Sequence, residues 1–156
     1  RHLLAEPDQA ELVRRQGPKP WLRRLSSEKE LLEQVRQDLE TWHADRKHGS
    51  VAVLCKTNAE ALRVYQSLHE ELPVHLITAE DEHFIKGLLV LPAYLAKGLE
   101  FDAVLIYDAG AHRYGEPERG LLYTACTRAL HELHVYHTGE VSPLLRDMDP
   151  QLFAST

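Results

Sequence analysis

Two short, uninterrupted runs of apolar residues constrain the fold of this chain more than any other feature. Residues 51–55 read Val-Ala-Val-Leu-Cys, and residues 103–107 read Ala-Val-Leu-Ile-Tyr. Such runs are typical of strands that are buried on both faces, as in a parallel sheet with helices on each side. Further apolar segments at 74–77, 87–91 and 133–136 predict three more strands. We therefore expect an α/β fold, in which helices flank a mainly parallel sheet.

Helical segments alternate with these strands. Residues 28–44 carry apolar side chains at helical spacing, and Ser26 or Ser27 is the expected N-cap, because Glu30 follows Ser27 as in a capping box. A second helix is expected to begin at Thr57 or Asn58, and residues 116–129 predict a third. Residues 15–20 contain two prolines and a glycine, so residues 1–27 are expected to form an irregular segment before one domain at 28–156.

The composition limits the partners that the chain can have. Its 18 Lys and Arg against 24 Asp and Glu give a net charge of −6, which argues against a domain that coats duplex nucleic acid but leaves a few contacts open. The two cysteines form no CxxC, which favours a reducing cytoplasm. The longest near-apolar run, residues 88–96, is far shorter than a membrane span, so no membrane partner is expected. The chain does not begin with methionine, and we expect it to be a piece of a longer protein.

Two loops beside the predicted strands carry an unusual concentration of reactive side chains. Residues 96–102 read Ala-Lys-Gly-Leu-Glu-Phe-Asp, and residues 123–129 read Tyr-Thr-Ala-Cys-Thr-Arg-Ala. Ligands of open parallel sheets bind where loops leave the carboxyl ends of strands, and we expect both loops there. The planar guanidinium of Arg128 suits a phosphate or a carboxylate. The alternative is a helix-end arginine that pairs with the helix dipole or with Glu132.

Three segments resemble motifs of the UvrD/Rep helicases of superfamily one. Residues 96–102 are similar to their motif V, and residues 118–129, Glu-Arg-Gly-Leu-Leu-Tyr-Thr-Ala-Cys-Thr-Arg-Ala, are similar to their motif VI. Residues 53–59 are similar to a third block, with Cys-Lys where the family usually has Tyr-Arg. The three segments occur in the same order along the chain as the corresponding motifs of the family. The amino-acid sequences of residues 92–98 and 121–128 are most similar to the HelD-type branch, whose members are ATPases that associate with RNA polymerase.

The resemblance implies a RecA-like fold of the P-loop NTPase type and a single lobe, the second motor lobe (2A) of an ATP-dependent DNA helicase. In this family ATP with Mg²⁺ lies between two lobes, and the first lobe supplies the phosphate-binding loop and the ligands of the metal. The present sequence contains no GxxxxGK[ST]. We therefore expect the isolated chain to be inactive as an ATPase and to work with a first lobe of the same parent chain.

Four residues match nucleotide-binding positions of the family. Arg128 matches the motif VI arginine, an arginine finger that reaches the γ-phosphate and is worth about 10³–10⁵ in rate. Glu100 matches the glutamate that hydrogen-bonds the ribose; its alternative is a solvated loop carboxylate. Gly98 permits a tight turn and a close backbone approach. Lys97 is expected to approach phosphates or to pair with an acidic residue of the other lobe, unless it is a plain surface lysine.

The expected contacts to single-stranded DNA rest on fewer matching residues. Lys56 and Asn58 fall on an arginine and an asparagine that meet DNA in the UvrD branch, although Asn58 also suits a helix cap. Pro92 and Tyr94 replace a threonine and a histidine of motif V; Tyr94 can stack on a base, whereas Pro92 has no hydroxyl to donate. This departure argues against processive tracking along the strand and fits a HelD-like protein that uses ATP to remodel a protein complex. The competing hypothesis is a module that docks RNA polymerase without catalysis.

Three histidines near the end of the chain are not expected to form a metal site. His134 and His137 would point to opposite faces of a strand, and no cysteine accompanies His131 at ligand spacing.

Overall fold

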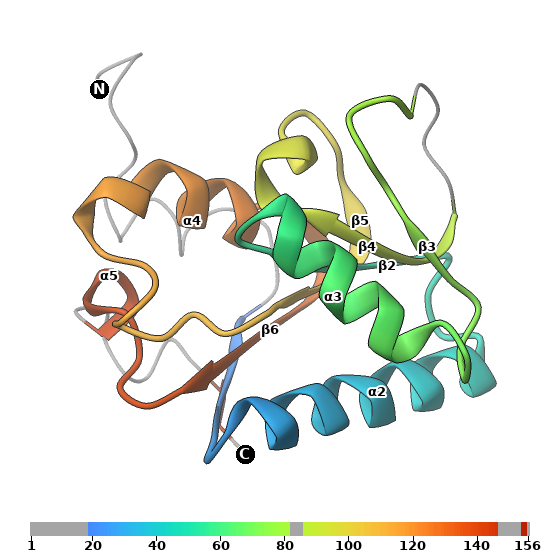
Figure 1. Ribbon diagram of the computed structural model, residues 1–156, viewed down its shortest axis with the longest axis horizontal. Helices are drawn as coiled ribbons and strands as arrows, with labels where there is room; N and C mark the ends of the chain where they lie inside the picture. The colour runs from blue at the N-terminus through green and yellow to red at the C-terminus, as the bar shows by residue number, and fades with distance from the viewer. Residues whose placement is uncertain (1–18, 82–85, 147–153, 156) are drawn as a thin grey trace.

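The computed structural model describes residues 19–81, 86–146 and 154–155. One seven-stranded sheet has the order β3-β4-β2-β5-β6-β1-β7, and all neighbouring strands are parallel (Figure 1). The strands are β1 (Trp21–Leu25), β2 (Ser50–Cys55), β3 (Val74–Leu76), β4 (Gly87–Pro92), β5 (Phe101–Ile106), β6 (Ala129–Thr138) and β7 (Ala154–Ser155). The helices are α2 (Glu28–Asp45), α3 (Asn58–Leu68), α4 (Arg119–Cys126), α5 (Pro143–Arg146) and the 3-10 helices η1 (Ala93–Ala96) and η2 (Glu116–Glu118). The predicted parallel sheet flanked by helices is confirmed.

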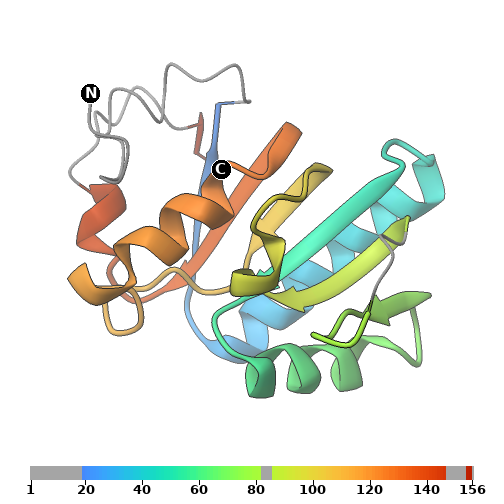
Figure 2. The same cartoon turned by 90° about the horizontal axis from the view of Figure 1, so that it is seen from above.

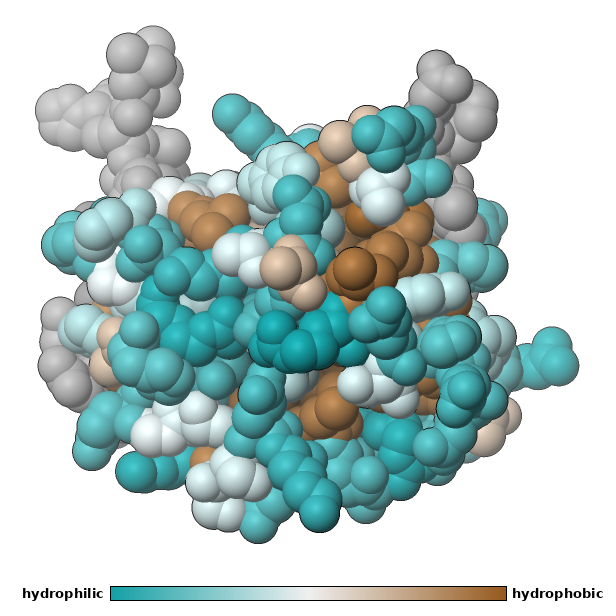
Figure 3. Space-filling model, in the orientation of Figure 1, coloured by the Kyte–Doolittle hydropathy of each residue, from teal (hydrophilic) through white to brown (hydrophobic). Residues whose placement is uncertain are grey.

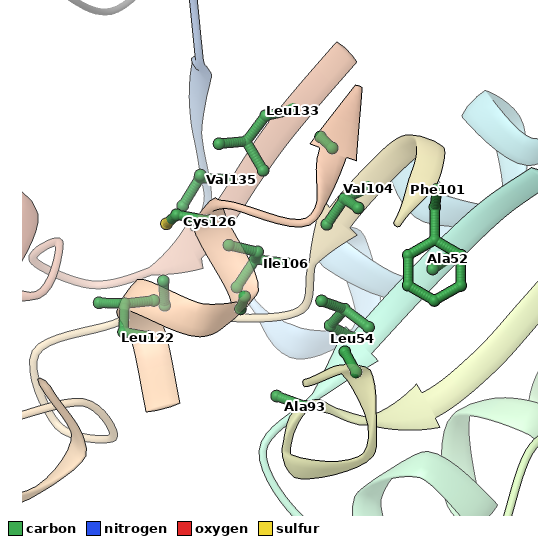
Figure 4. Packing of buried hydrophobic residues seen from close by; sticks show 14 of the residues in the cluster. Ala52, Leu54, Ala93, Phe101, Val104, Ile106, Leu122, Cys126, Leu133 and Val135 are labelled. Carbon is green, nitrogen blue, oxygen red and sulfur yellow. The ribbon is translucent and has the colours of Figure 1, made fainter. Parts of the chain in front are cut away.

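Helices cover both faces of the sheet (Figure 2). Because successive side chains of a strand point to opposite faces, Val51 and Val53 of β2 pack with α2 and α3, whereas Ala52 and Leu54 pack with η1, α4 and α5. Every residue of β2 is buried, which explains why its sequence shows no polar alternation. Figure 4 shows the second of these two cores, where side chains of β2, β5 and β6 meet those of η1 and α4.

The starts of the two long helices follow their capping residues. The Ser27 hydroxyl accepts a hydrogen bond from the Glu30 N–H at 3.1 Å, as predicted, while the Glu30 carboxylate accepts from the N–H of Ser26 rather than of Ser27. For α3 the cap is Thr57, whose hydroxyl accepts from the N–H of Glu60 at 3.1 Å. The outer surface over α2 and α3 is mainly hydrophilic (Figure 3).

Strand β1 lies inside the segment 1–27, which the sequence analysis expected to be irregular. It runs parallel to β6, with Trp21 opposite His134. The strand is only partly buried, so its sequence, Trp-Leu-Arg-Arg-Leu, lacks the apolar run that identified the central strands. Residues 1–18 of this segment lie outside the described residues.

The helix predicted at 116–129 is shorter than expected. It divides into η2 and α4, and α4 ends at Cys126. The following strand, β6, begins at Ala129, four residues before the predicted start at 133. Among the described residues, no helix combines the length and the apolar composition that crossing a membrane requires.

Candidate functional site

The candidate residues form two groups at opposite ends of the parallel sheet. Glu100 and Arg128 directly precede β5 and β6, so they lie at the amino ends of these strands. Lys56 directly follows β2, and Tyr94 lies two residues after the end of β4, so they lie at the carboxyl ends. The expectation that both motif loops lie at carboxyl ends is therefore wrong. A connection between parallel strands must return to the amino end, and both loops are the last residues of such a return.

The turn that carries Lys97 and Glu100 leads from η1 into β5. It is closed by a hydrogen bond from the Leu99 N–H to the Ala96 carbonyl at 2.9 Å. Gly98 has a φ of +84°, a conformation that side chains with a Cβ disfavour, and a Cβ added there would meet no atom within 4 Å. The turn thus needs glycine for its backbone and leaves the space around it open. Lys97 and Glu100 are both exposed.

Arg128 is attached to this turn through both its main chain and its side chain. The Arg128 carbonyl accepts from the Phe101 N–H at 2.9 Å. Its guanidinium donates from Nη1 to the Leu99 carbonyl at 3.3 Å and from Nε to the Thr124 carbonyl at 3.2 Å. A third bond runs from Nη2 to the hydroxyl of Thr127 at 3.1 Å. The fold therefore brings together Arg128 and the turn that carries Lys97 and Glu100, two segments that are far apart in the sequence.

The acceptors around the half-buried guanidinium of Arg128 are all uncharged. Within residues 19–81, 86–146 and 154–155, no carboxylate lies at ion-pair distance from it. Arg113 differs, because it lies 2.6 Å from a carboxylate oxygen of Glu60 and 3.7 Å from one of Asp108. A cation removed from water without a counter-charge is costly, so Arg128 is disposed to accept an anionic ligand.

Glu132, the alternative partner considered for Arg128, is bound elsewhere. It pairs with Lys47 at 2.8 Å, with His48 at 2.6 Å and with His134 at 3.0 Å. Burial favours the neutral carboxyl, but the hydrogen bonds from Lys47, His134 and His48 outweigh burial and lower the pKa of Glu132 to about 2. The contact of Arg128 with the end of α4, in contrast, is present through the Thr124 carbonyl.

At the other end of the sheet, Asn58 and Tyr94 contact each other. Their side chains lie within hydrogen-bond distance, with the Tyr94 hydroxyl 3.2 Å from Asn58 Nδ2 and 3.3 Å from Asn58 Oδ1. Because Thr57 caps α3, Asn58 does not serve as the cap. The Tyr94 residue is 48% exposed, which leaves its ring open to a planar ligand. The Lys56 ammonium lies 5.8 Å from the ring centre of Tyr114.

The sequence analysis missed a buried ion pair between Glu60 and Arg113, which contacts the backbone of Lys56. Glu60 is only 5% exposed; its carboxylate accepts from the Lys56 N–H at 2.9 Å and pairs with Arg113. The spacing of Thr57 and Glu60 is that of a capping box, which was the available signal for Glu60. No sequence signal pointed to Arg113, because it lies far from Glu60 in the chain, in the loop after β5. Thr127 was likewise not singled out.

The three histidines near the end of the chain make different contacts: the His131 ring stacks on the ring of His48, with ring centres 6.5 Å apart. His134 lies between Trp21 and Trp42, with ring centres 6.1 and 5.0 Å away. The His137 ring is hydrogen-bonded to the Gly139 carbonyl. No group of three or more His, Cys, Asp or Glu side chains in the described parts of the chain is placed to hold a metal ion.

Comparisons with known proteins agree with this geometry. The family model of the UvrD-like helicase C-terminal domain matches residues 87–136, which run from β4 to β6 and contain both the turn and Arg128. The C-terminal domain of a possible DNA helicase from Lactobacillus plantarum WCFS1 is 32% identical to this chain and has a TM-score of 0.79, over 94% of this chain and 93% of that domain. The comparison with curated proteins gives no match. On the family match, the identity and the coverage together, the chain belongs to the family of UvrD-like helicase C-terminal domains, with their RecA-like fold.

Proposed function

We propose that this domain is the second motor lobe of an ATP-dependent DNA helicase or translocase, and that it supplies an arginine finger to ATP bound between two lobes. The observation that carries the proposal is the half-buried guanidinium of Arg128, whose hydrogen-bond acceptors among the described residues are all uncharged, in a segment bonded to the turn of the exposed Glu100. A cation without a counter-charge at this place is suited to the charge of a transferring phosphoryl group.

The turn supplies the other contacts to the nucleotide. Glu100, exposed at the amino end of β5, accepts hydrogen bonds from the ribose hydroxyls. Gly98 lets the backbone of the turn approach the ligand closely, because the space around it is open. Lys97 is exposed beside it and approaches the phosphates or an acidic side chain of the first lobe. Carboxylates of that first lobe hold the Mg²⁺ that accompanies ATP.

Single-stranded DNA follows the opposite end of the sheet in this proposal. The Tyr94 ring stacks on a base, and its hydrogen bond to Asn58 limits the orientations of the ring. Lys56 contacts a phosphate as a point charge. With a net charge of −6, the lobe offers few phosphate contacts, so stacking contributes much of the affinity.

The presence of Pro92 and Tyr94 in motif V supports a finer assignment within the family. We place the lobe in the HelD-type branch, whose members associate with RNA polymerase, because the sequences of residues 92–98 and 121–128 are most similar to that branch. Pro92, which offers no hydroxyl for tracking DNA, fits a protein that uses ATP to remodel a protein complex. In the competing hypothesis the lobe docks RNA polymerase without handling nucleotide, and Arg128 is then dispensable.

Replacing Arg128 tests the proposal in the protein that joins this lobe to a first lobe. Arg128→Ala should lower kcat for ATP by at least ~10², while KM changes far less, because the finger acts mainly in the transition state. Arg128→Lys should restore little, since an ammonium lacks the planar fork. Arg36→Ala is the matched control; Arg36 pairs with Glu33 and Glu40 on α2, at a distance from the turn. An Arg128→Ala protein with wild-type kcat would refute the proposed function.

A further inference from the structure

Thr127 lies directly before Arg128 and contacts its guanidinium. The Thr127 hydroxyl donates its hydrogen toward two carbonyl oxygens, that of Tyr123 at 3.0 Å and that of Thr124 at 3.1 Å. The same hydroxyl oxygen accepts a hydrogen bond from Arg128 Nη2 at 3.1 Å. A hydroxyl has one hydrogen to donate and lone pairs with which to accept, so both contacts can exist at once. Thr127 therefore links the last turn of α4 to the guanidinium.

The guanidinium of Arg128 uses only some of its N–H groups in the hydrogen bonds described above. An arginine has five N–H groups, and three of those of Arg128 are engaged, one each on Nε, Nη1 and Nη2. Among the described residues, one N–H on each terminal nitrogen has no acceptor. Two parallel N–H groups are what a bidentate contact with phosphate requires.

We propose that Thr127 is a positioning residue, which fixes the guanidinium of Arg128 so that its two remaining N–H groups are available to phosphate; the inference rests on the proposed function of Arg128. A long side chain held in one orientation before the ligand arrives loses less freedom when it acts. The Leu99 carbonyl also accepts a hydrogen bond from the guanidinium, so the orientation of Arg128 depends on the same turn that carries Glu100.

Two substitutions of Thr127 separate its hydroxyl from its shape. Thr127→Val keeps the branched side chain and removes the hydroxyl, and we expect kcat for ATP to fall about tenfold while KM stays within about twofold. Thr127→Ser keeps the hydroxyl and should restore most of kcat. Serine and valine variants that are equally slow would overturn the inference, because the hydroxyl would then not be the cause.

A double-mutant cycle shows whether Thr127 acts through Arg128. In an Arg128→Ala background, Thr127→Val should change kcat by less than about twofold, since no guanidinium is left to position. A further tenfold fall in that background would overturn the inference and leave Thr127 a structural residue of α4. That outcome is distinct from failure of the proposed function, in which Arg128→Ala itself retains wild-type kcat and the inference falls with it.

Discussion

Two partly buried arginines of this lobe differ in what surrounds their charge. Arg113 pairs with Glu60 and Asp108, so its charge is matched inside the fold. Arg128 donates to two carbonyls and a hydroxyl, and these stabilise the guanidinium without neutralising it. Removing one partner of a buried ion pair is strongly destabilising, whereas binding an anion beside Arg128 is favourable. The surroundings of Arg113 are those of a stabilising ion pair, whereas those of Arg128 support the proposed contact with an anionic ligand.

Glu100 should affect the affinity for nucleotide rather than the chemical step. A ribose contact is made equally in the ground state and the transition state, so Glu100→Gln should raise KM for ATP about tenfold, or ~1.4 kcal/mol, and leave kcat nearly unchanged. Steady-state curves of the two-lobed protein measure both constants. Glu70→Gln, a change at another exposed glutamate, serves as the control. A fall in kcat at constant KM would contradict the ribose assignment.

Glu132 joins β6 to the loop that follows α2. Its carboxylate receives Lys47 and His48 from that loop and His134 from its own strand. Trp42 of α2 packs against His48 and His134, with ring centres 5.5 and 5.0 Å away. The charge of Glu132 thus helps to fix α2 on the sheet, and this contribution depends on pH.

Glu132→Gln should reduce the loss of stability in acid. Burial opposes the charge of Glu132, but its hydrogen bonds to Lys47, His134 and His48 lower its pKa from 4.5 to about 2 in the folded chain. The folded chain therefore binds fewer protons than the unfolded chain between these values. The stability from Glu132 is complete above about pH 4.5 and is lost as the pH falls toward 2.

Urea unfolding of the wild type and Glu132→Gln between pH 2.5 and 7 measures this difference. The variant should be less stable at neutral pH, and below pH 4.5 the slope of its unfolding free energy should be smaller by up to about one proton, or ~1.4 kcal/mol per pH unit. Glu70→Gln, at an exposed position, should follow the wild type. Parallel curves for the wild type and Glu132→Gln would show that Glu132 does not carry this dependence.

The turn proposed to bind nucleotide, residues 97–100, and the proposed DNA contacts lie at opposite ends of the sheet, yet one short segment connects them. Tyr94 lies in η1, and Lys97 directly follows this helix. η1 also packs against α4, which ends next to Arg128. η1 therefore connects the two groups both along the chain and through its packing.

The sequence predicts the centre of this lobe better than its margins. The buried runs of β2 and β5 identified the sheet because strands covered on both faces need apolar residues throughout. β1 was missed because a partly exposed strand with two arginines has no such run. The motifs predicted that Arg128 and Glu100 belong to one nucleotide site. They did not predict the hydrogen bonds of Arg128 to the Leu99 carbonyl and the Thr127 hydroxyl, because these contacts depend on the tertiary structure.

The lobe alone should not hydrolyse ATP. Its sequence contains no GxxxxGK[ST], so half of the proposed site must come from another lobe. Phosphate release by the purified 156-residue chain should equal the blank, while the two-lobed protein turns over under the same conditions. Hydrolysis by the isolated chain that Arg128→Ala abolishes would contradict this expectation.

The central claim is that Arg128 stabilises the transition state of phosphoryl transfer, and ligand affinity tests it most directly. The measurement compares binding of ADP with aluminium fluoride, a mimic of the transition state, and of a non-hydrolysable ATP analogue to the two-lobed protein with and without Arg128→Ala. We predict that the substitution weakens the mimic at least ~10²-fold and the ATP analogue less than about threefold. Equal losses for both ligands, or no loss for the mimic, would contradict the assignment of Arg128 as the arginine finger.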